Sequence, residues 1–122
     1  MKIYIAHASN FDFKNDLYEP IRRSSLSKEY SFCLPHDSSN KLFNTKELLE
    51  KCNLVIAEVS YPSTGMGIEL GWANVFKVPI VCFYKKGTKP SNSLKIVTNL
   101  ILEYRDSDDL ISKIKEAIKT FQ

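Results

Sequence analysis

One stretch of the sequence decides the fold: AEVSYPSTGMGIELGWA, at positions 57–73. The residues LVI at 54–56 make the chain that leads into it almost continuously apolar, which is typical of a parallel strand covered on both faces. Residues that favour turns follow, among them Pro62, Gly65 and Gly67. A helical pattern then begins near residue 67, so we expect Glu69 in the first turn of a helix. The stretch therefore predicts a central strand, a tight loop and a helix N-terminus.

The loop of this stretch has the chemistry of a sugar or phosphate site. Its glycines permit a positive φ or the close approach of a ligand to the backbone. The free N–H groups of the first helical turn, together with the hydroxyls of Ser63 and Thr64, can hold a phosphate or sugar oxygen. Glu69 has two interpretations at this point: it complements the positive end of the helix dipole, or it is a reactive carboxylate in a site.

Outside this stretch, strand-like and helix-like patterns alternate along the chain. We predict strands at 2–6, 30–34, 54–59, 79–84 and 98–104, and helices at 13–25, 43–52, 67–77 and 107–120. Asn44 or Thr45 is expected to open the second helix as the N-cap of a capping box. Alternation of this kind is built from right-handed βαβ units. We therefore predict an α/β fold, a single domain over residues 1–122 with a doubly wound parallel five-stranded sheet in a flavodoxin-like, Rossmann-like three-layer sandwich.

Composition excludes several classes of partner. The 122 residues carry a net charge of +3, and the basic residues are scattered, so we expect no nucleic acid polymer as a partner. Cys33, Cys52 and Cys82 lack the spacing of a metal site, and we expect them to be reduced and structural. No signal peptide or membrane-length apolar run is apparent. These features predict a cytoplasmic protein with no membrane partner.

In a doubly wound sheet, ligands bind outside the carboxyl ends of the strands. The predicted strands place four polar segments there, at 7–10, 35–39, 60–69 and 85–93. The chain has neither a P-loop lysine nor a dinucleotide-binding glycine pattern, and two isolated histidines make a poor metal site. We therefore expect no cofactor and no metal. Glu69 is the candidate nucleophile at this edge of the sheet.

The residues of the loop and helix follow a longer pattern, IAEVS at 56–60 and then P-S-x-G-x-G-x-E-L-G-x-A at 62–73. This pattern resembles the nucleoside 2-deoxyribosyltransferase family, and its 2'-deoxynucleoside 5'-monophosphate N-glycosidase branch is similar too. The opening strand, KIYIA at 2–6, also fits. The resemblance implies cleavage or transfer at the N-glycosidic bond of 2'-deoxyribonucleosides or their 5'-monophosphates, and hence a small-molecule nucleoside or nucleotide as the partner.

The resemblance also implies roles for individual residues. The glutamate of the G-x-E-L-G segment, Glu69, would attack the anomeric carbon of deoxyribose. Ser63, helped by the backbone of Gly65 and Gly67, would hold the 5' end of the sugar or its phosphate. The chemistry is sound, because a carboxylate stabilises an oxocarbenium-like state and then traps it as a glycosyl ester.

A neighbouring subunit completes the site in this family. The resemblance therefore implies a homo-oligomer and a role for Asn92 or Ser93 in the basic loop.

Four further residues are candidates from their positions. Tyr4 lies at the end of the first strand, where its hydroxyl can orient Glu69, although a strand tyrosine also serves packing. His36 or Asp37 can supply the proton that a leaving base needs, and a solvated loop is the alternative interpretation. His7 either packs beside the first loop or contacts the ligand.

Two positions depart from the family pattern. Family members carry an aspartate near the start of the helix after the second strand, where this chain reads FNTKE at 43–47, and an acidic residue before the third strand, where it has Cys52 and Asn53. The alternative function is therefore a nucleotide-binding or sensing module that kept the loop and lost efficient chemistry. The opening IAHAS at 5–9 has a fainter similarity to TIR domains, some of which cleave NAD with a glutamate, and this gives a third hypothesis.

Overall fold

The computed structural model describes residues 1–37 and 44–122. Its centre is an all-parallel five-stranded sheet in the order β2-β1-β3-β4-β5. The strands are β1 (Lys2–His7), β2 (Ser31–Cys33), β3 (Leu54–Glu58), β4 (Ile80–Lys85) and β5 (Ile101–Tyr104). The helices are α1 (Glu19–Arg23), α2 (Leu26–Glu29), α3 (Lys46–Glu50), α4 (Thr64–Val75) and α5 (Ser107–Thr120), with a π-type turn η1 (Lys14–Tyr18) and a 3-10 turn η2 (Asn92–Ile96).

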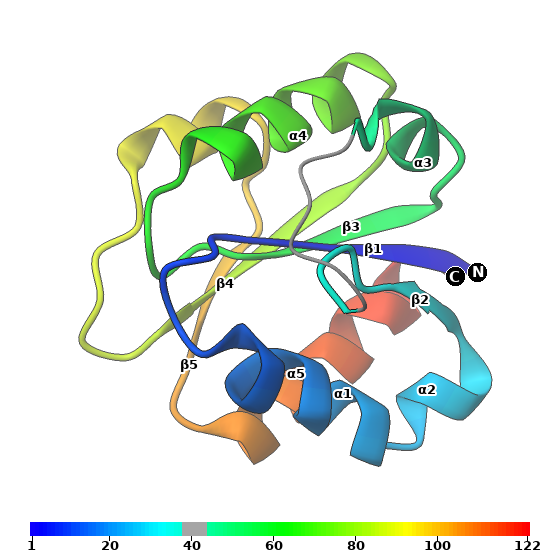
Figure 1. Ribbon diagram of the computed structural model, residues 1–122, viewed down its shortest axis with the longest axis vertical. Helices are drawn as coiled ribbons and strands as arrows, with labels where there is room; N and C mark the ends of the chain where they lie inside the picture. The colour runs from blue at the N-terminus through cyan, green and yellow to red at the C-terminus, as the bar shows by residue number, and fades with distance from the viewer. Residues whose placement is uncertain (38–43) are drawn as a thin grey trace.

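Helices cover both faces of the sheet, as Figure 1 shows. The α3 and α4 helices and η2 lie on one face, and α1, α2 and α5 lie on the other. The strand order is the flavodoxin-like one, whose switch point lies between β1 and β3. The predicted fold class, a doubly wound parallel sheet in three layers, is confirmed.

The side chains of the central strands alternate between the two faces. On β1, Ile3 and Ile5 pack into the cluster that contains Ile114 of α5, whereas Tyr4 packs into the cluster that contains Leu70 of α4. All of these side chains are buried. Successive strand residues point to opposite faces, so an apolar run such as β1 supplies both cores. The same alternation sends the Tyr4 hydroxyl toward α4.

The boundaries of the α5 helix are as predicted, but other predicted boundaries were wrong. The single helix predicted at 13–25 is instead η1 followed by α1, and Pro20 lies in the first turn of α1, where proline is tolerated. The chain turns extended at Ser24, and the short helix α2, which was not predicted, follows. The strand predicted at 98–104 begins only at Ile101, because the Thr98 hydroxyl donates to the carbonyl of Ile80 at 2.6 Å and shapes the segment before it.

The helix predicted at 43–52 is also shorter in the structure. Its described part is α3, and Phe43, the first residue of the prediction, lies outside the described residues. The expected capping box is absent: Thr45 makes no side-chain bond to the helix backbone. Asn44 accepts a hydrogen bond from the Lys46 N–H at 2.9 Å instead. The Thr45 side chain is therefore available for another contact.

The α4 helix begins earlier than the sequence predicts. Ser63 is its N-cap, and the Ser63 Oγ accepts a hydrogen bond from the Met66 N–H at 3.4 Å. Starting the helix at Thr64 moves Glu69 into the second turn, so the expectation of a first-turn carboxylate was wrong. The first turn of α4 holds no acidic residue. Complementing the helix dipole, which acts mainly on the first turn, therefore does not account for Glu69.

Candidate functional site

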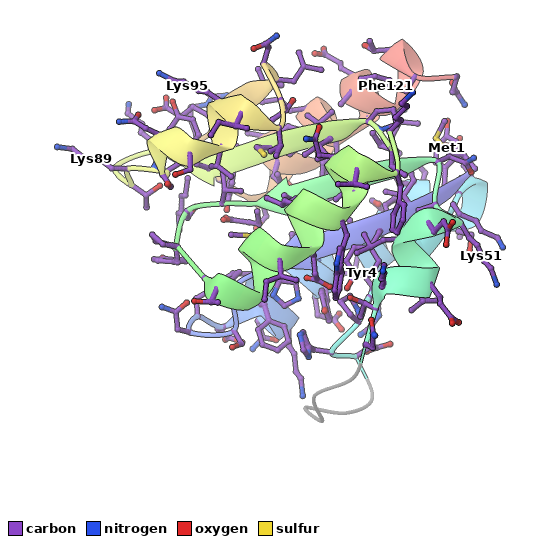
Figure 2. The ribbon with its side chains drawn as sticks, turned by 90° about the horizontal axis from the view of Figure 1, so that it is seen from above. Met1, Tyr4, Lys51, Lys89, Lys95 and Phe121 are labelled. Atoms are coloured by element: carbon purple, nitrogen blue, oxygen red, sulfur yellow. The ribbon has the colours of Figure 1, made fainter. Side chains whose placement is uncertain are left out.

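A cavity of about 310 Å³ opens at the carboxyl edge of the sheet, between the ends of β1 and β2 and the start of α4. Its size is near the lower end of the range for small-molecule sites. Its lining residues are Tyr4, His7, Ser9, Pro35, His36, Thr45, Ser63, Gly65, Met66, Ile68, Glu69 and Trp72. Figure 2 shows Tyr4 at this place, between α3 and α4. Six of the ten residues that the sequence predicts for the site thus lie together.

Two hydroxyl groups hold the Glu69 carboxylate by the same oxygen atom. The Tyr4 hydroxyl donates a hydrogen bond to Oε2, and the Thr45 Oγ1 donates a second one at 2.6 Å. Burial, with the nearby charge of Glu69 as the next cause, raises the pKa of Tyr4 far above its usual value, so the phenol keeps its proton and acts as the donor. Among the described residues, none donates a hydrogen bond to Oε1. Within the described part of the chain, Oε2 is therefore held by two donors and Oε1 by none.

Thr45 is a residue of the candidate site that sequence reasoning missed. Only 6% of its surface is exposed, although it precedes an amphipathic helix at a position where a solvated cap is common. The sequence signal was ambiguous, because a threonine before a helix normally serves as the N-cap. Which partner takes its hydroxyl is decided by the packing of α3 against α4.

His7 is tied into a buried hydrogen-bond chain. The Ala8 carbonyl lies 2.6 Å from Nδ1 and accepts its proton, while the Tyr18 hydroxyl, 2.6 Å from Nε2, donates to the second nitrogen. The Tyr18 oxygen in turn accepts from the His36 backbone N–H at 3.0 Å. Burial lowers the pKa of His7 to about 4 and raises that of Tyr18 to about 12. His7 is therefore neutral and lines the cavity with its ring carbons rather than with a free nitrogen.

The two candidate proton donors are separated in the structure. The His36 side chain lines the cavity beside His7, with ring centroids 5.4 Å apart. Asp37 instead forms an ion pair with Arg22 at the surface, and half of its side chain is exposed. The two residues that follow it in the predicted polar segment, Ser38 and Ser39, lie outside the described residues. Of the pair, only His36 lines the cavity with Glu69.

The predicted anchor residues divide between two neighbouring cavities. Ser63 and Gly65 line the cavity with Glu69. Gly67 and Ser93 line a second one of about 400 Å³ on the other side of the loop, to which Ser63 also contributes. Asn92 is in the lining of neither cavity. Within this chain, Asn92 and Ser93 are therefore not brought to Glu69.

The expected use of the glycines is partly wrong. Gly65 and Gly67 lie inside α4 and have ordinary helical φ angles, so a positive φ is not their role. The space beside them is open: a Cβ on Gly65 would meet only the Ser63 Oγ, at 4.0 Å, and one on Gly67 would meet nothing within 4 Å. Of the two expected uses of these glycines, the one that remains is to leave room for a ligand to approach the backbone.

The other departure from the family pattern concerns the opposite edge of the sheet. The Asn53 Oδ1 accepts a hydrogen bond from the Lys2 N–H at 2.7 Å, where β1 and β3 begin. A carboxylate at that position would be far from the cavity, which lies where the strands end. The loss that bears on the site is the one next to α3, where Thr45 stands.

The described residues contain no cluster of three or more potential metal ligands. All three cysteines are free thiols, and burial raises the pKa of Cys52 to about 11 and that of Cys82 to about 12. In the part of the chain that the structure describes, no helix combines the length and apolar character needed to cross a membrane.

Comparison with known sequences finds two curated relatives that share part of this chain. A 2'-deoxynucleoside 5'-phosphate N-hydrolase 1 from Methanosarcina mazei is 38% identical over 72 residues, which are 59% of this chain and 42% of the relative. The protein of the same name from Methanosarcina barkeri is 35% identical over 74 residues, 61% of this chain and 46% of the relative. The chain thus spans less than half the length of the curated relatives it matches. No family model matches the chain.

Solved structures share the fold over most of the chain. A CMP N-glycosidase from Clostridium botulinum superposes with a TM-score of 0.68 at 20% identity, covering 94% of this chain and 99% of that protein. A 2-deoxyribosyltransferase from Leishmania mexicana gives a TM-score of 0.54 at 23% identity, covering 68% and 63%. At these identities the likeness establishes the fold. With the sequence relatives, it confirms the predicted resemblance of this chain to the nucleoside 2-deoxyribosyltransferase family and its N-glycosidase branch.

Proposed function

We propose that the protein cleaves or transfers the N-glycosidic bond of 2'-deoxyribonucleosides or their 5'-monophosphates, with Glu69 as the nucleophile and residues 1–122 acting as one domain. The observation that carries the proposal is the state of Glu69: one of its oxygens is held by Tyr4 and Thr45, and the residue lines a cavity of about 310 Å³. The N-hydrolase name of the sequence relatives and the N-glycosidase name of a fold neighbour support the same class of reaction.

The reaction proceeds through a covalent sugar ester. Oε1 of Glu69 bonds to the anomeric carbon while the bond from that carbon to the base nitrogen breaks, and the electron pair of that bond leaves with the base. Water or a second base then attacks the same carbon and gives its proton to His36, which lost its own proton to the first base, while the bond from the carbon to Oε1 breaks and the Glu69 carboxylate is released. An acceptor base gives transfer and water gives hydrolysis, so one site supports both outcomes.

His36 is the proposed proton donor to the departing base. Its ring lines the cavity with Glu69, whereas Asp37 is held by Arg22 and takes no part. A histidine suits this step because its ordinary pKa is close to neutral. His7 and Tyr18 support His36 through the backbone hydrogen bond to its N–H.

Ser63 and Gly65 are the proposed anchor for the 5' end of the sugar. The Ser63 hydroxyl can rotate to donate to a 5' oxygen while it still accepts from the Met66 N–H. The backbone next to Gly65 is open to a ligand. Hydroxyl and N–H donors at a helix start bind a phosphate well, so the 5'-monophosphate is the preferred form of the substrate.

A homo-oligomer is part of the proposal. The outer side of α4 exposes Ile68 and Val75, and the half-buried Trp72 lies between them along the helix. Ile68 and Trp72 also line the cavity, so a second copy seated on this face would close the site and bring Asn92 or Ser93 to it. Light scattering of the wild type and of Val75→Lys tests this, with dissociation of the variant expected. The free cysteines agree with a cytoplasmic location.

The experiment for the proposed activity measures base release by chromatography. The purified protein is incubated with 2'-deoxynucleosides and their 5'-monophosphates, with and without a second free base. Release or exchange is expected from the wild type, and the Glu69→Gln variant should lose it, because the amide keeps the shape of the side chain and removes the nucleophile. Glu47→Gln on the exposed side of α3 is the matched control, and it should match the wild type.

The alternative function, a nucleotide-binding or sensing module, is favoured by one observation: the sequence at the start of α3, FNTKE at 43–47, has no aspartate where members of the family carry one. This hypothesis predicts nucleotide binding by calorimetry without base release, and it predicts that Thr45→Asp restores release. The TIR-like hypothesis is tested separately, by incubation with NAD and detection of nicotinamide. The deoxyribosyl proposal expects no nicotinamide.

A further inference from the structure

Thr45 is an unusual threonine for its place in the chain. It directly precedes α3, yet its hydroxyl makes no hydrogen bond to the helix backbone. Only 6% of the residue's surface is exposed. Its Oγ1 reaches Oε2 of Glu69 at 2.6 Å, which is the usual distance for a hydroxyl that donates to a carboxylate. The described structure leaves no buried side-chain polar atom without a partner, so this contact is what satisfies the Thr45 hydroxyl.

The two donors to Glu69 come from separate parts of the fold. Tyr4 is fixed by β1, in the centre of the sheet, and Thr45 is fixed by the chain that enters α3. A carboxylate that is held by one donor can still swing about that bond, whereas two donors on one oxygen define the plane of the group. The plane sets where Oε1 points, and a misplaced reacting atom costs roughly a hundredfold in rate for about 1 Å.

We propose that Thr45 is a positioning residue, which together with Tyr4 fixes the Glu69 carboxylate through Oε2 and directs Oε1 at the anomeric carbon. This inference rests on the proposed function. Thr45 is neutral, so it orients the nucleophile without placing a second negative charge beside it. The hydroxyl of Thr45 then supports the nucleophile near the place, at the start of α3, where the chain departs from the family pattern.

The same two hydrogen bonds act in the second half of the reaction. In the glycosyl ester, Oε2 becomes the carbonyl oxygen and still accepts from both hydroxyls. When water attacks the anomeric carbon, the bond from that carbon to Oε1 breaks and its electron pair returns to the carboxylate. Negative charge then grows on Oε2, where the two donors stabilise it. Loss of the Thr45 hydroxyl should therefore slow the release of the sugar as well as its capture.

The test compares Thr45→Val and Thr45→Ser in the full-length protein. Valine keeps the shape and removes the donor, and kcat for base release should fall about 10- to 100-fold with a smaller change in KM. Serine keeps the donor and should stay within a few fold of the wild type. Pre-steady-state kinetics of the Thr45→Val protein should show both steps slowed, the first release of base that reports capture of the sugar and the later turnover that reports its release. Thr98→Val, which removes a comparable hydroxyl contact far from the cavity, is the control and should leave kcat unchanged.

Two results would overturn the role of Thr45: wild-type turnover in Thr45→Val, or equal damage from valine and serine, which would point to packing. Crystal structures of the wild type and Thr45→Val give a readout that does not need activity. The Glu69 carboxylate should turn or take more than one conformation in the variant, and an unchanged plane contradicts the proposal. A wild type that releases no base refutes the proposed function instead, while these structures still decide the contact.

Discussion

Two glutamates lie at the carboxyl edge of the sheet in very different surroundings. Glu58, the last residue of β3, is 3% exposed and accepts hydrogen bonds from the Ser60 N–H at 2.6 Å, from the Ser60 hydroxyl at 2.9 Å and from the Tyr104 hydroxyl. Both of its oxygens are occupied, and the cavity beside it measures only about 60 Å³. Glu69 has one oxygen held by the hydroxyls of Tyr4 and Thr45, and its side chain lines a cavity of about 310 Å³.

The difference teaches how the same side chain becomes structural or reactive. The Ser60 hydroxyl also accepts from the Lys85 N–H at 2.8 Å, so Glu58 joins the ends of β3, β4 and β5. A carboxylate with all its hydrogen bonds made inside the protein has none to offer a ligand. Among the described residues, Glu69 has donors on one oxygen alone, and these two donors orient the carboxylate without using its other oxygen.

The largest expected effect is on activity at Glu69. Glu69→Gln should lower base release by at least about a thousandfold, because the nucleophile is removed. Its free energy of unfolding should stay within about 1 kcal/mol of the wild type, since the Tyr4 and Thr45 hydroxyls can donate to the amide oxygen. Chromatography of the released base and urea denaturation measure the two quantities. A strong loss of stability in this variant would show that Glu69, like Glu58, mainly stabilises the fold.

His7, which lines the same cavity as Glu69, makes the stability of the protein depend on pH. Burial lowers the pKa of His7 from 6.5 to about 4, so the unfolded chain binds a proton more readily than the folded one. This contribution to stability is complete above pH 6.5 and is lost as the pH falls toward 4, by about 3 kcal/mol in total. Urea denaturation at a series of pH values should show the loss, and His7→Gln should flatten the curve in that window. Parallel curves for the two proteins would contradict it.

At Glu58 the expected effect is on stability. Glu58→Gln places an amide opposite buried donors, and we expect a loss of about 2 to 3 kcal/mol in the free energy of unfolding. The folded fraction should still release base at a rate close to the wild type. Denaturation, and kcat corrected for the folded fraction, test this. A stable but inactive Glu58→Gln would reverse the assignment of the two glutamates.

The smallest effects come from removing one hydroxyl beside each carboxylate. Tyr104→Phe should lower the free energy of unfolding by about 1 to 2 kcal/mol, because it leaves a buried oxygen of Glu58 with one donor fewer. Tyr4→Phe should instead lower kcat by about tenfold or more, because it frees the nucleophile to rotate. Thermal unfolding and single-turnover kinetics on both variants give a direct comparison. Equal changes in stability and in kcat for the two variants would contradict the distinction between a structural Glu58 and a reactive Glu69.

Much of the fold could be predicted from local patterns. The apolar runs of β1 and β3, the turn residues after β3 and the amphipathic period of α5 each specify their element with little help from the rest of the chain. The ends of helices and strands were less predictable where a side chain makes a hydrogen bond to a distant part of the chain. Thr98 shifts the start of β5 by bonding to Ile80, and no local pattern announces that contact.

The candidate site was predictable to the extent that it is contained in one stretch. Ser63, Gly65 and Glu69 lie within seven residues of one another, and the flavodoxin-like order adds Tyr4 and His36 by placing strand ends side by side. Asp37 shows the limit of that reasoning. It is the neighbour of His36 in the sequence, but successive side chains point in different directions. The Asp37 carboxylate forms an ion pair with Arg22 at the surface instead.

The sequence by itself determined which segments form strands and helices, which strands are apolar on both faces and that a carboxylate follows the third strand, because hydrophobic periodicity and turn chemistry act over short distances along the chain. Only the tertiary structure decided which of the two carboxylates has, among the described residues, an oxygen without a donor. That choice depends on donors 24 and 65 residues away from Glu69, those of Thr45 and Tyr4, and on the Tyr104 hydroxyl, 46 residues from Glu58. Hydrogen bonds between distant segments form only after the layers have packed, so a linear pattern does not contain them.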